Sequence, residues 1–258
     1  MPRVLNDGVA IHYRVEGSGS PLILLHGFTD SSETWYELGY VDALKAKHQI
    51  LLPDTRGHGQ SDKPHDQQAY TPANFAADIV AVLNDAGIRK AVCWGYSQGG
   101  WIAFALAQHA AERVSGLIIG GAASAGSAYQ AEPGKDDPLL AVLRRGAGAS
   151  APLFGEWLTP AIEQRLRAND TAALIACRQQ RLVTGGYSNL GKIAVPALLY
   201  AGNADPIHDA ARQSASEISD AVFASLPGLD HIGAMCQPHL ILPQAQQLLE
   251  KASINAVA

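Results

Sequence analysis

The most informative segment of the chain is Gly95-Tyr96-Ser97-Gln98-Gly99. It follows the apolar run of residues 91–94 and opens a helical pattern at residues 100–106. In a Gly-x-Ser-x-Gly turn between a buried strand and a helix, the serine occupies a sharp, strained turn and its hydroxyl projects clear of the sheet. The helix that follows directs N–H groups and its positive dipole end at the same point. This context predicts a nucleophilic serine, Ser97, rather than an idle turn.

Short apolar runs alternate with longer helical patterns on both sides of this turn. The pattern predicts an α/β fold with a mostly parallel central sheet and helices on both faces. The predicted strands are residues 9–15 at the edge, 21–25, 49–52, 91–94, 114–119, 197–200 and 222–226. The predicted helices are residues 34–47, 72–86, 98–109, 210–218 and 238–252.

Residues 125–192 break the alternation because they contain no convincing strand. Helical pieces at 139–145, 161–169 and 172–182 are separated there by loops rich in Gly, Ala and Pro. We expect a small helical lid, inserted between late strands, over the C-terminal edge of the sheet, where ligands bind in open α/β sheets. The alternative is that these helices only cover one sheet face. Residues 1–124 and 193–258 then form the core domain.

A serine nucleophile needs a base, and the base needs an acid to orient it. Asp205 follows the predicted strand 197–200, and His231 follows the predicted strand 222–226. The order Ser97, Asp205, His231 matches the order known for this class of hydrolase. Asp209 and Asp230 are the rival acids, but Asp230 is adjacent to His231, and neighbours in sequence seldom point their side chains together.

Acyl transfer also needs hydrogen-bond donors for the oxyanion. The sequence His26-Gly27-Phe28 follows the predicted strand 21–25, where this architecture supplies one backbone N–H group. We expect the backbone N–H groups of Phe28 and Gln98 to form the oxyanion hole, with His26 in a structural role beneath the loop.

The bulk composition argues against several other classes of protein. The chain has 258 residues, with 47% hydrophobic residues, 17% charged residues and a net charge of −5, which is typical of a globular protein and gives no electrostatic reason to bind nucleic acid. The three cysteines are far apart and indicate reduced core residues. The absence of a signal peptide pattern and of a membrane-spanning stretch predicts a cytoplasmic protein.

Five blocks of sequence resemble the α/β-hydrolase superfamily, in the family order: residues 26–28, 54–61, 95–100, 202–205 and 228–231. The resemblance implies the α/β-hydrolase fold and a carboxylesterase-like serine hydrolase with a helical lid. It also implies that residues 54–61 form a mainly structural turn. Ser97 argues against haloalkane dehalogenases and epoxide hydrolases, which have aspartate there, and Gln98 argues against perhydrolases, which usually have methionine there.

The predicted function is hydrolysis of small or medium apolar carboxylic esters through an acyl-enzyme intermediate. No phosphate-binding lysine loop, zinc-ligand spacing or dinucleotide fingerprint occurs, so we expect no cofactor and no metal, and a small-molecule substrate. The alternatives are a C–C bond hydrolase or lactonase of the same fold, and a ligand receptor that retains the three residues. The residues predicted to contact substrate are Trp35, Tyr96, Phe154 and Trp157.

Overall fold

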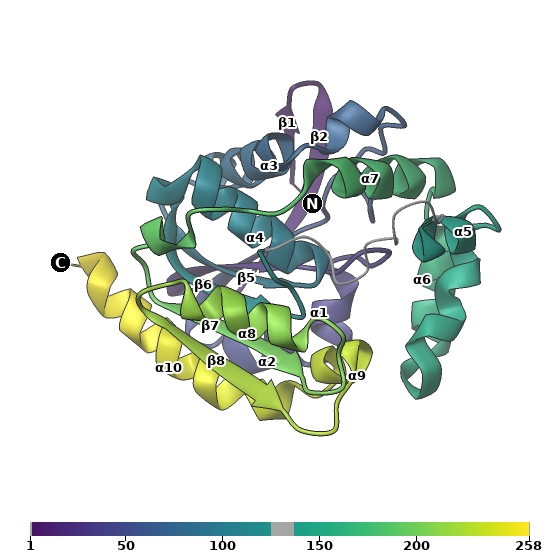
Figure 1. The fold of residues 1–258 in the computed structure, drawn as a ribbon. Helices are drawn as coiled ribbons and strands as arrows, with labels where there is room; N and C mark the ends of the chain where they lie inside the picture. Colours follow the sequence, from purple (N-terminus) through teal and green to yellow (C-terminus); the bar gives the residue numbers. More distant parts are fainter. Residues whose placement is uncertain (1, 125–136, 258) are drawn as a thin grey trace.

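The computed structural model describes residues 2–124 and 137–257, which form a single eight-stranded sheet with helices on both faces (Figure 1). The strand order is β1-β2-β4-β3-β5-β6-β7-β8. The β1–β2 and β2–β4 pairs are antiparallel, and the remaining pairs are parallel. The strands are β1 (Arg3–Asn6), β2 (Val9–Glu16), β3 (Ser20–Leu25), β4 (His48–Pro53), β5 (Ala91–Tyr96), β6 (Val114–Gly120), β7 (Ala197–Gly202) and β8 (Ala221–Leu226).

Helices connect these strands. The α-helices are α1 (Glu33–Glu37), α2 (Tyr40–Leu44), α3 (Pro72–Asp85), α4 (Gln98–His109), α5 (Pro138–Leu143), α6 (Pro160–Ala168), α7 (Thr171–Thr184), α8 (His208–Ser216), α9 (His231–Cys236) and α10 (Pro238–Val257). The 3₁₀ segments are η1 (Gln67–Tyr70), η2 (Ala111–Arg113), η3 (Ala147–Trp157) and η4 (Leu190–Lys192).

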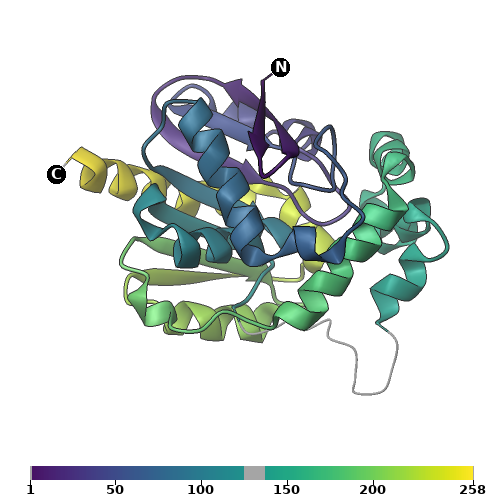
Figure 2. The ribbon, with the colours of Figure 1, turned by 90° about the horizontal axis from the view of Figure 1, so that it is seen from above.

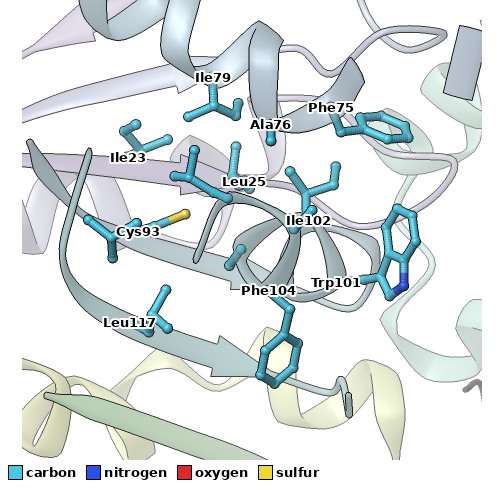
Figure 3. Packing of buried hydrophobic residues seen from close by; sticks show 14 of the residues in the cluster. Ile23, Leu25, Phe75, Ala76, Ile79, Cys93, Trp101, Ile102, Phe104 and Leu117 are labelled. Atoms are coloured by element: carbon cyan, nitrogen blue, oxygen red, sulfur yellow. The ribbon is translucent and has the colours of Figure 1, made fainter. Parts of the chain in front are cut away.

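Two hydrophobic layers lie on opposite faces of the sheet, because successive residues of a strand point to opposite faces. Ile23 and Leu25 of β3 pack with α3 and α4, as Figure 3 shows for the centre of this layer. Leu22 and Leu24 pack on the other face with side chains of α1, α2 and α10. Both faces of the central strands are therefore dry, which accounts for their unbroken apolar sequences.

Several elements differ from the sequence prediction, among them the short helix α9 and two elements near the N-terminus. Residues 3–6 form β1, an edge strand too short and too exposed to leave an apolar pattern, with Leu5 71% exposed. The predicted helix 34–47 is two short helices, α1 and α2. The chain turns between them at Gly39, where φ is 79°, a left-handed conformation that ends an α-helix.

In its described part, the segment between β6 and β7 contains helices and loops but no strand. Residues 125–136 of the predicted lid lie outside the described residues. Helices α5 and α6 stand apart from the two layers that cover the sheet, on the side of α9 (Figures 1 and 2). They have small hydrophobic clusters of their own, whereas Ala173, Ala176 and Cys177 of α7 join the layer of α3 and α4. The 3₁₀ segment η3 was not predicted, because it contains Pro152 and a Gly155 with positive φ.

The three cysteines are free thiols: Cys93 and Cys177 are buried, and Cys236 is partly buried. Within the described ranges 2–124 and 137–257, no helix is both long and apolar enough to cross a bilayer.

A buried ion pair ties the loop after β4 to α3. Arg56 donates from Nε and Nη2 to the two carboxylate oxygens of Asp78, both at 2.6 Å, and from Nη1 to the carbonyl of Ala69. Both charged side chains are 2% exposed, and Asn6 also donates to Asp78. The loop is thereby fixed by a two-pronged contact that excludes water.

Removing one member of this pair should be costly, because the other charge is left buried without a partner. We expect Asp78→Ala to lower the free energy of unfolding by about 3–5 kcal/mol. The control is Glu163→Ala, which breaks the exposed Glu163–Arg167 pair and should cost less than about 1 kcal/mol. Urea unfolding followed by tryptophan fluorescence measures both, and equal losses would contradict the prediction.

Candidate active site

Ser97 lies at the turn between β5 and α4 in a strained conformation, with φ 53° and ψ −112°. Its backbone N–H donates to the carbonyl of Gly120, and its own carbonyl accepts from Trp101. The flanking glycines have no room for side chains: a Cβ on Gly95 would lie 2.1 Å from the carbonyl oxygen of Gly99, and one on Gly99 would lie 2.0 Å from that of Leu25. The chain can therefore make this turn only with glycine at both positions.

A chain of two hydrogen bonds joins Ser97, His231 and Asp205. His231 Nε2 is 3.0 Å from Ser97 Oγ, and His231 Nδ1 is 2.6 Å from Asp205 Oδ2. The ionised carboxylate of Asp205 can only accept, so Nδ1 carries the proton and Nε2 is left to accept from the serine hydroxyl. Asp205 is 3% exposed, and its other oxygen accepts from the N–H of Ile207, so its orientation is fixed.

The rival acids make other contacts. Asp230 accepts from the N–H of Gly233 at 2.7 Å and thereby caps α9. Asp209 is exposed and contacts His208 and Arg212. Asp205 is the acid that the structure places against His231.

Tyr96 and Gly121 hold His231 from the side. The Tyr96 hydroxyl donates to the carbonyl of His231, and the two rings lie 5.5 Å apart. A Cβ on Gly121 would lie 3.0 Å from Cε1 of His231. Tyr96 was predicted as a substrate contact, and it lines the cavity, but it also positions the imidazole. Gly121 was not predicted, because a glycine after a strand carries no signal of what it makes room for.

The two predicted oxyanion donors lie beside Ser97. Gln98 is the first residue of α4, and the loop of Gly27 and Phe28 approaches so closely that a Cβ on Gly27 would lie 3.7 Å from that of Ser97. Within the described residues, neither the Phe28 nor the Gln98 backbone N–H has a hydrogen-bond acceptor. Both residues line the cavity above the serine. These N–H groups are therefore free to bind an oxygen atom there.

Buried hydrogen bonds of His26 fix the loop after β3, which contains Phe28. The His26 ring donates from Nδ1 to the carbonyl of Gly27 and accepts at Nε2 from the N–H of Thr55. Burial alone would raise the pKa of Asp54, but the His26 ring and the N–H groups of Gln60 and Ser32 hold it below its ordinary value. The loop after β4 thus fixes the loop after β3.

A cavity of about 640 Å³ opens over Ser97 and His231. Of the predicted substrate contacts, Tyr96 and Phe154 line it. Trp35 and Trp157 do not, which corrects the prediction. Trp35 is fully buried on the far face of the sheet, with its ring against those of Tyr40 and Trp94. Trp157 ends η3 and lies against Gly233 of α9.

Cys177 lines the same cavity but is not a rival nucleophile. Burial raises the pKa of its thiol to about 12, so the group is protonated at neutral pH. Its Sγ donates instead to the side-chain oxygen of Gln98. In the described part of the chain, no cluster of three or more His, Cys, Asp or Glu side chains is arranged to hold a metal ion.

Comparison with known sequences points to one fold. A family model described as "alpha/beta hydrolase fold" matches residues 20–143. Epoxide hydrolase 4 of Mus musculus is 35% identical over 120 residues, which are 45% of this chain and 33% of that protein. The matches span about a third of the length of such curated relatives.

Comparison with solved structures covers nearly the whole chain. An esterase from a Rhodococcus species is 27% identical, with a TM-score of 0.77 over 96% of this chain and 97% of that chain. An enol-lactonase from Burkholderia xenovorans is 22% identical, with a TM-score of 0.82 over 96% of this chain and 100% of that chain. The likeness extends through the segment from α5 to α7 that the family model leaves largely unmatched.

Because the carbonyl group of Leu25 lies so close to Gly99, we expect any side chain at this position to destabilise the fold strongly. Gly99→Ala should lower the free energy of unfolding by about 3 kcal/mol or more, because backbone atoms of β3 must move. Gly191→Ala is the matched control: its Cβ would have no neighbour closer than 3.6 Å, and we expect a change within about 1 kcal/mol. Urea unfolding compares them, and a Gly99→Ala protein as stable as the control would contradict the described turn.

Proposed function

We propose that this chain, a hydrolase of the α/β-hydrolase superfamily, cleaves carboxylic esters through an acyl-enzyme intermediate on Ser97. One observation carries the proposal. The hydrogen-bonded line from Ser97 through His231 to Asp205 opens into a cavity, and two unoccupied backbone N–H groups lie beside the serine. Nucleophile, base, orienting acid and oxyanion donors are the parts that acyl transfer requires.

In the proposed mechanism, Ser97 Oγ attacks the ester carbonyl carbon while His231 Nε2 takes the hydroxyl proton. The oxyanion of the tetrahedral intermediate accepts hydrogen bonds from the backbone N–H groups of Phe28 and Gln98. Asp205 stabilises the imidazolium that forms. His231 then gives the proton to the leaving alcohol, which leaves an acyl group on Ser97. Water, deprotonated by His231, then attacks the acyl carbon. The bond from the acyl carbon to Ser97 Oγ breaks, the carboxylic acid is released, and His231 returns the proton to Ser97 Oγ.

The cavity supports small or medium substrates, because its volume lies within the range of ordinary small-molecule sites. Much of its wall is apolar, with Phe75, Leu139, Val142, Phe154, Ile162 and Met235 among the lining residues. Residues of α5, η3, α6 and α7 all contribute to this lining. We therefore propose that residues 125–192 act as a lid over a core of residues 1–124 and 193–258.

Two related activities remain as alternatives. A lactonase would use the same attack on an acyl carbon, and an enol-lactonase is among the similar structures. A C–C bond hydrolase would need the same base and oxyanion donors. Epoxide opening fits less well: the resemblance implies an aspartate nucleophile for that reaction, and residue 97 is serine. A receptor that keeps the three residues would form a lasting adduct on Ser97 instead of turning over.

Ser97→Ala should abolish hydrolysis of p-nitrophenyl butyrate, with a loss in kcat on the order of 10⁴-fold or more if the three residues act as a unit. The loss follows because no other described group beside His231 can take the acyl group. Ser216→Ala, an exposed serine on α8, is the matched control and should keep full activity. Initial rates at saturating substrate provide the measurement, and substantial activity in the Ser97 variant would refute the nucleophile.

Asp205→Asn should lower kcat on the order of 10³- to 10⁴-fold, because an amide at this position favours the wrong tautomer of His231. Asp230→Asn changes the neighbouring acid in the same way. It should keep activity within about threefold, because an asparagine side chain also caps a helix. Thermal unfolding checks that both variants fold. A larger loss in the Asp230 variant would mean that the acid is wrongly assigned.

A further inference from the structure

Three hydrogen-bond donors without acceptors lie in or directly behind one wall of the cavity. Within the described residues, Gln98 Nε2, Trp101 Nε1 and the Tyr187 hydroxyl are buried and have no hydrogen-bond partner. Gln98 and Trp101 line the cavity, together with Cys177 and Arg181 of α7. Buried polar groups are normally paired, so three orphaned donors in one place need an explanation.

These donors form one continuous group around Arg181. Its guanidinium lies 4.6 Å from the centre of the Trp101 ring, and that ring lies 5.4 Å from the ring of Tyr187. Trp101 is one helical turn from Gln98 on α4. Cys177 is one turn before Arg181 on α7 and donates to the side chain of Gln98. The group therefore reaches from α7 to the residue next to the nucleophile.

Arg181 is the cation in this group, and it has no acid beside it. Its Nη1 donates to the carbonyl of Gly185, and no carboxylate among the described residues pairs with it. Burial lowers the pKa of Arg181 to about 10, so it is still charged at neutral pH. Arg181 is partly buried, and a partly desolvated charge without a counter-charge is costly, so an anion is a favourable occupant of this wall.

The other charged groups that line the cavity are already paired. Arg178 donates to both carboxylate oxygens of Asp137. On the opposite side, Asp30 and Glu37 both accept from Arg165, which lies on α6. The Arg178–Asp137 pair is neutral, and the Asp30–Glu37–Arg165 cluster keeps one net negative charge. Within the described part of the chain, Arg181 is therefore the lining cation without an ion-pair partner, and a ligand anion can pair with it.

We propose that Arg181, assisted by Gln98 and Trp101, binds a free carboxylate of the substrate, so that the favoured substrates are esters that carry a second, ionised carboxyl group. This inference rests on the proposed function and names its substrate class. The planar guanidinium suits a carboxylate, to which it donates two parallel hydrogen bonds. Arg181 is then a specificity-determining residue, and the apolar wall accommodates the carbon chain between the two carboxyl groups.

Turnover on matched esters tests the inference. Monoethyl esters of succinic, glutaric, adipic and suberic acids are compared with ethyl esters of monocarboxylic acids of equal chain length, with acid release followed in a pH-stat. At least one monoethyl ester should be preferred in kcat/KM. In Arg181→Met its kcat/KM should fall about 10- to 100-fold, mainly through KM, as expected for lost hydrogen bonds to a charged group. The neutral esters should change by less than about threefold.

Two further variants separate charge from structure. Arg181→Lys keeps the positive charge but loses the planar group that donates two parallel hydrogen bonds. This variant should retain part of the preference for monoethyl esters. Arg145→Met removes an exposed arginine of the same segment and should leave the preference intact. An equal loss on charged and neutral esters in Arg181→Met, or no preference in the native protein, would overturn the inference.

Direct binding separates this inference from the proposed function. Calorimetric titration of Ser97→Ala with adipate and with 1,6-hexanediol needs no turnover. Adipate should bind at least about tenfold more tightly, and Arg181→Met in the same background should remove the difference. If adipate binds in this way but no ester is hydrolysed, the proposed function fails and the carboxylate site stands. If neutral esters are hydrolysed and adipate binds no better than the diol, the site is wrong and the esterase stands.

Discussion

The backbone at Ser97 is the constraint on which the rest of the site depends. A non-glycine residue at φ 53° and ψ −112° is unfavourable and persists only where its surroundings hold it. Here β5, α4 and the end of β3 lie very close together. A Cβ at Gly95 or Gly99 would overlap backbone atoms of the neighbouring segment. Folding of the sheet supplies the energy that keeps the serine hydroxyl exposed at the strand end, beside the first N–H groups of α4.

The remaining parts reach this point because parallel strands end at one edge of the sheet. The loop after β3 brings Phe28, the loop after β7 brings Asp205, and α9, which follows β8, begins with His231. Buried polar contacts away from the serine fix the first of these loops: His26 accepts from Thr55 of the loop after β4, and Arg56 of that loop is paired with Asp78 of α3. A rigid site of this kind reduces reorganisation during the reaction. The segment from α5 to α7 contributes residues to the wall of the cavity, and we propose that this wall distinguishes substrates.

The sequence was informative where chemistry leaves a local signature. Ser97, Asp205 and His231 each follow an apolar strand, so their meeting at one sheet edge follows from the fold. Positions set by tertiary packing were not predictable. Trp35 is on a short helix that packs on the sheet, and Trp157 packs on α9. The residues next to them in sequence do not predict either orientation. Arg178 is paired because Asp137, which is far away in the chain, lies beside it in the fold. The neighbouring sequence does not reveal that Arg178 has such a partner and that Arg181 does not. The exposed strand β1 left no apolar pattern to detect.

The assignment of Ser97 as the activated nucleophile is tested by covalent labelling with an alkyl fluorophosphonate. Such a reagent phosphonylates a serine only where a base activates it and donors stabilise the developing charge. Intact-mass and peptide mass spectrometry should show one adduct per chain, on the peptide that contains Ser97, with hydrolysis of p-nitrophenyl butyrate lost in proportion to labelling. Adduct formation on a different residue, or full activity after complete labelling of Ser97, would contradict the assignment of Ser97 as the activated nucleophile.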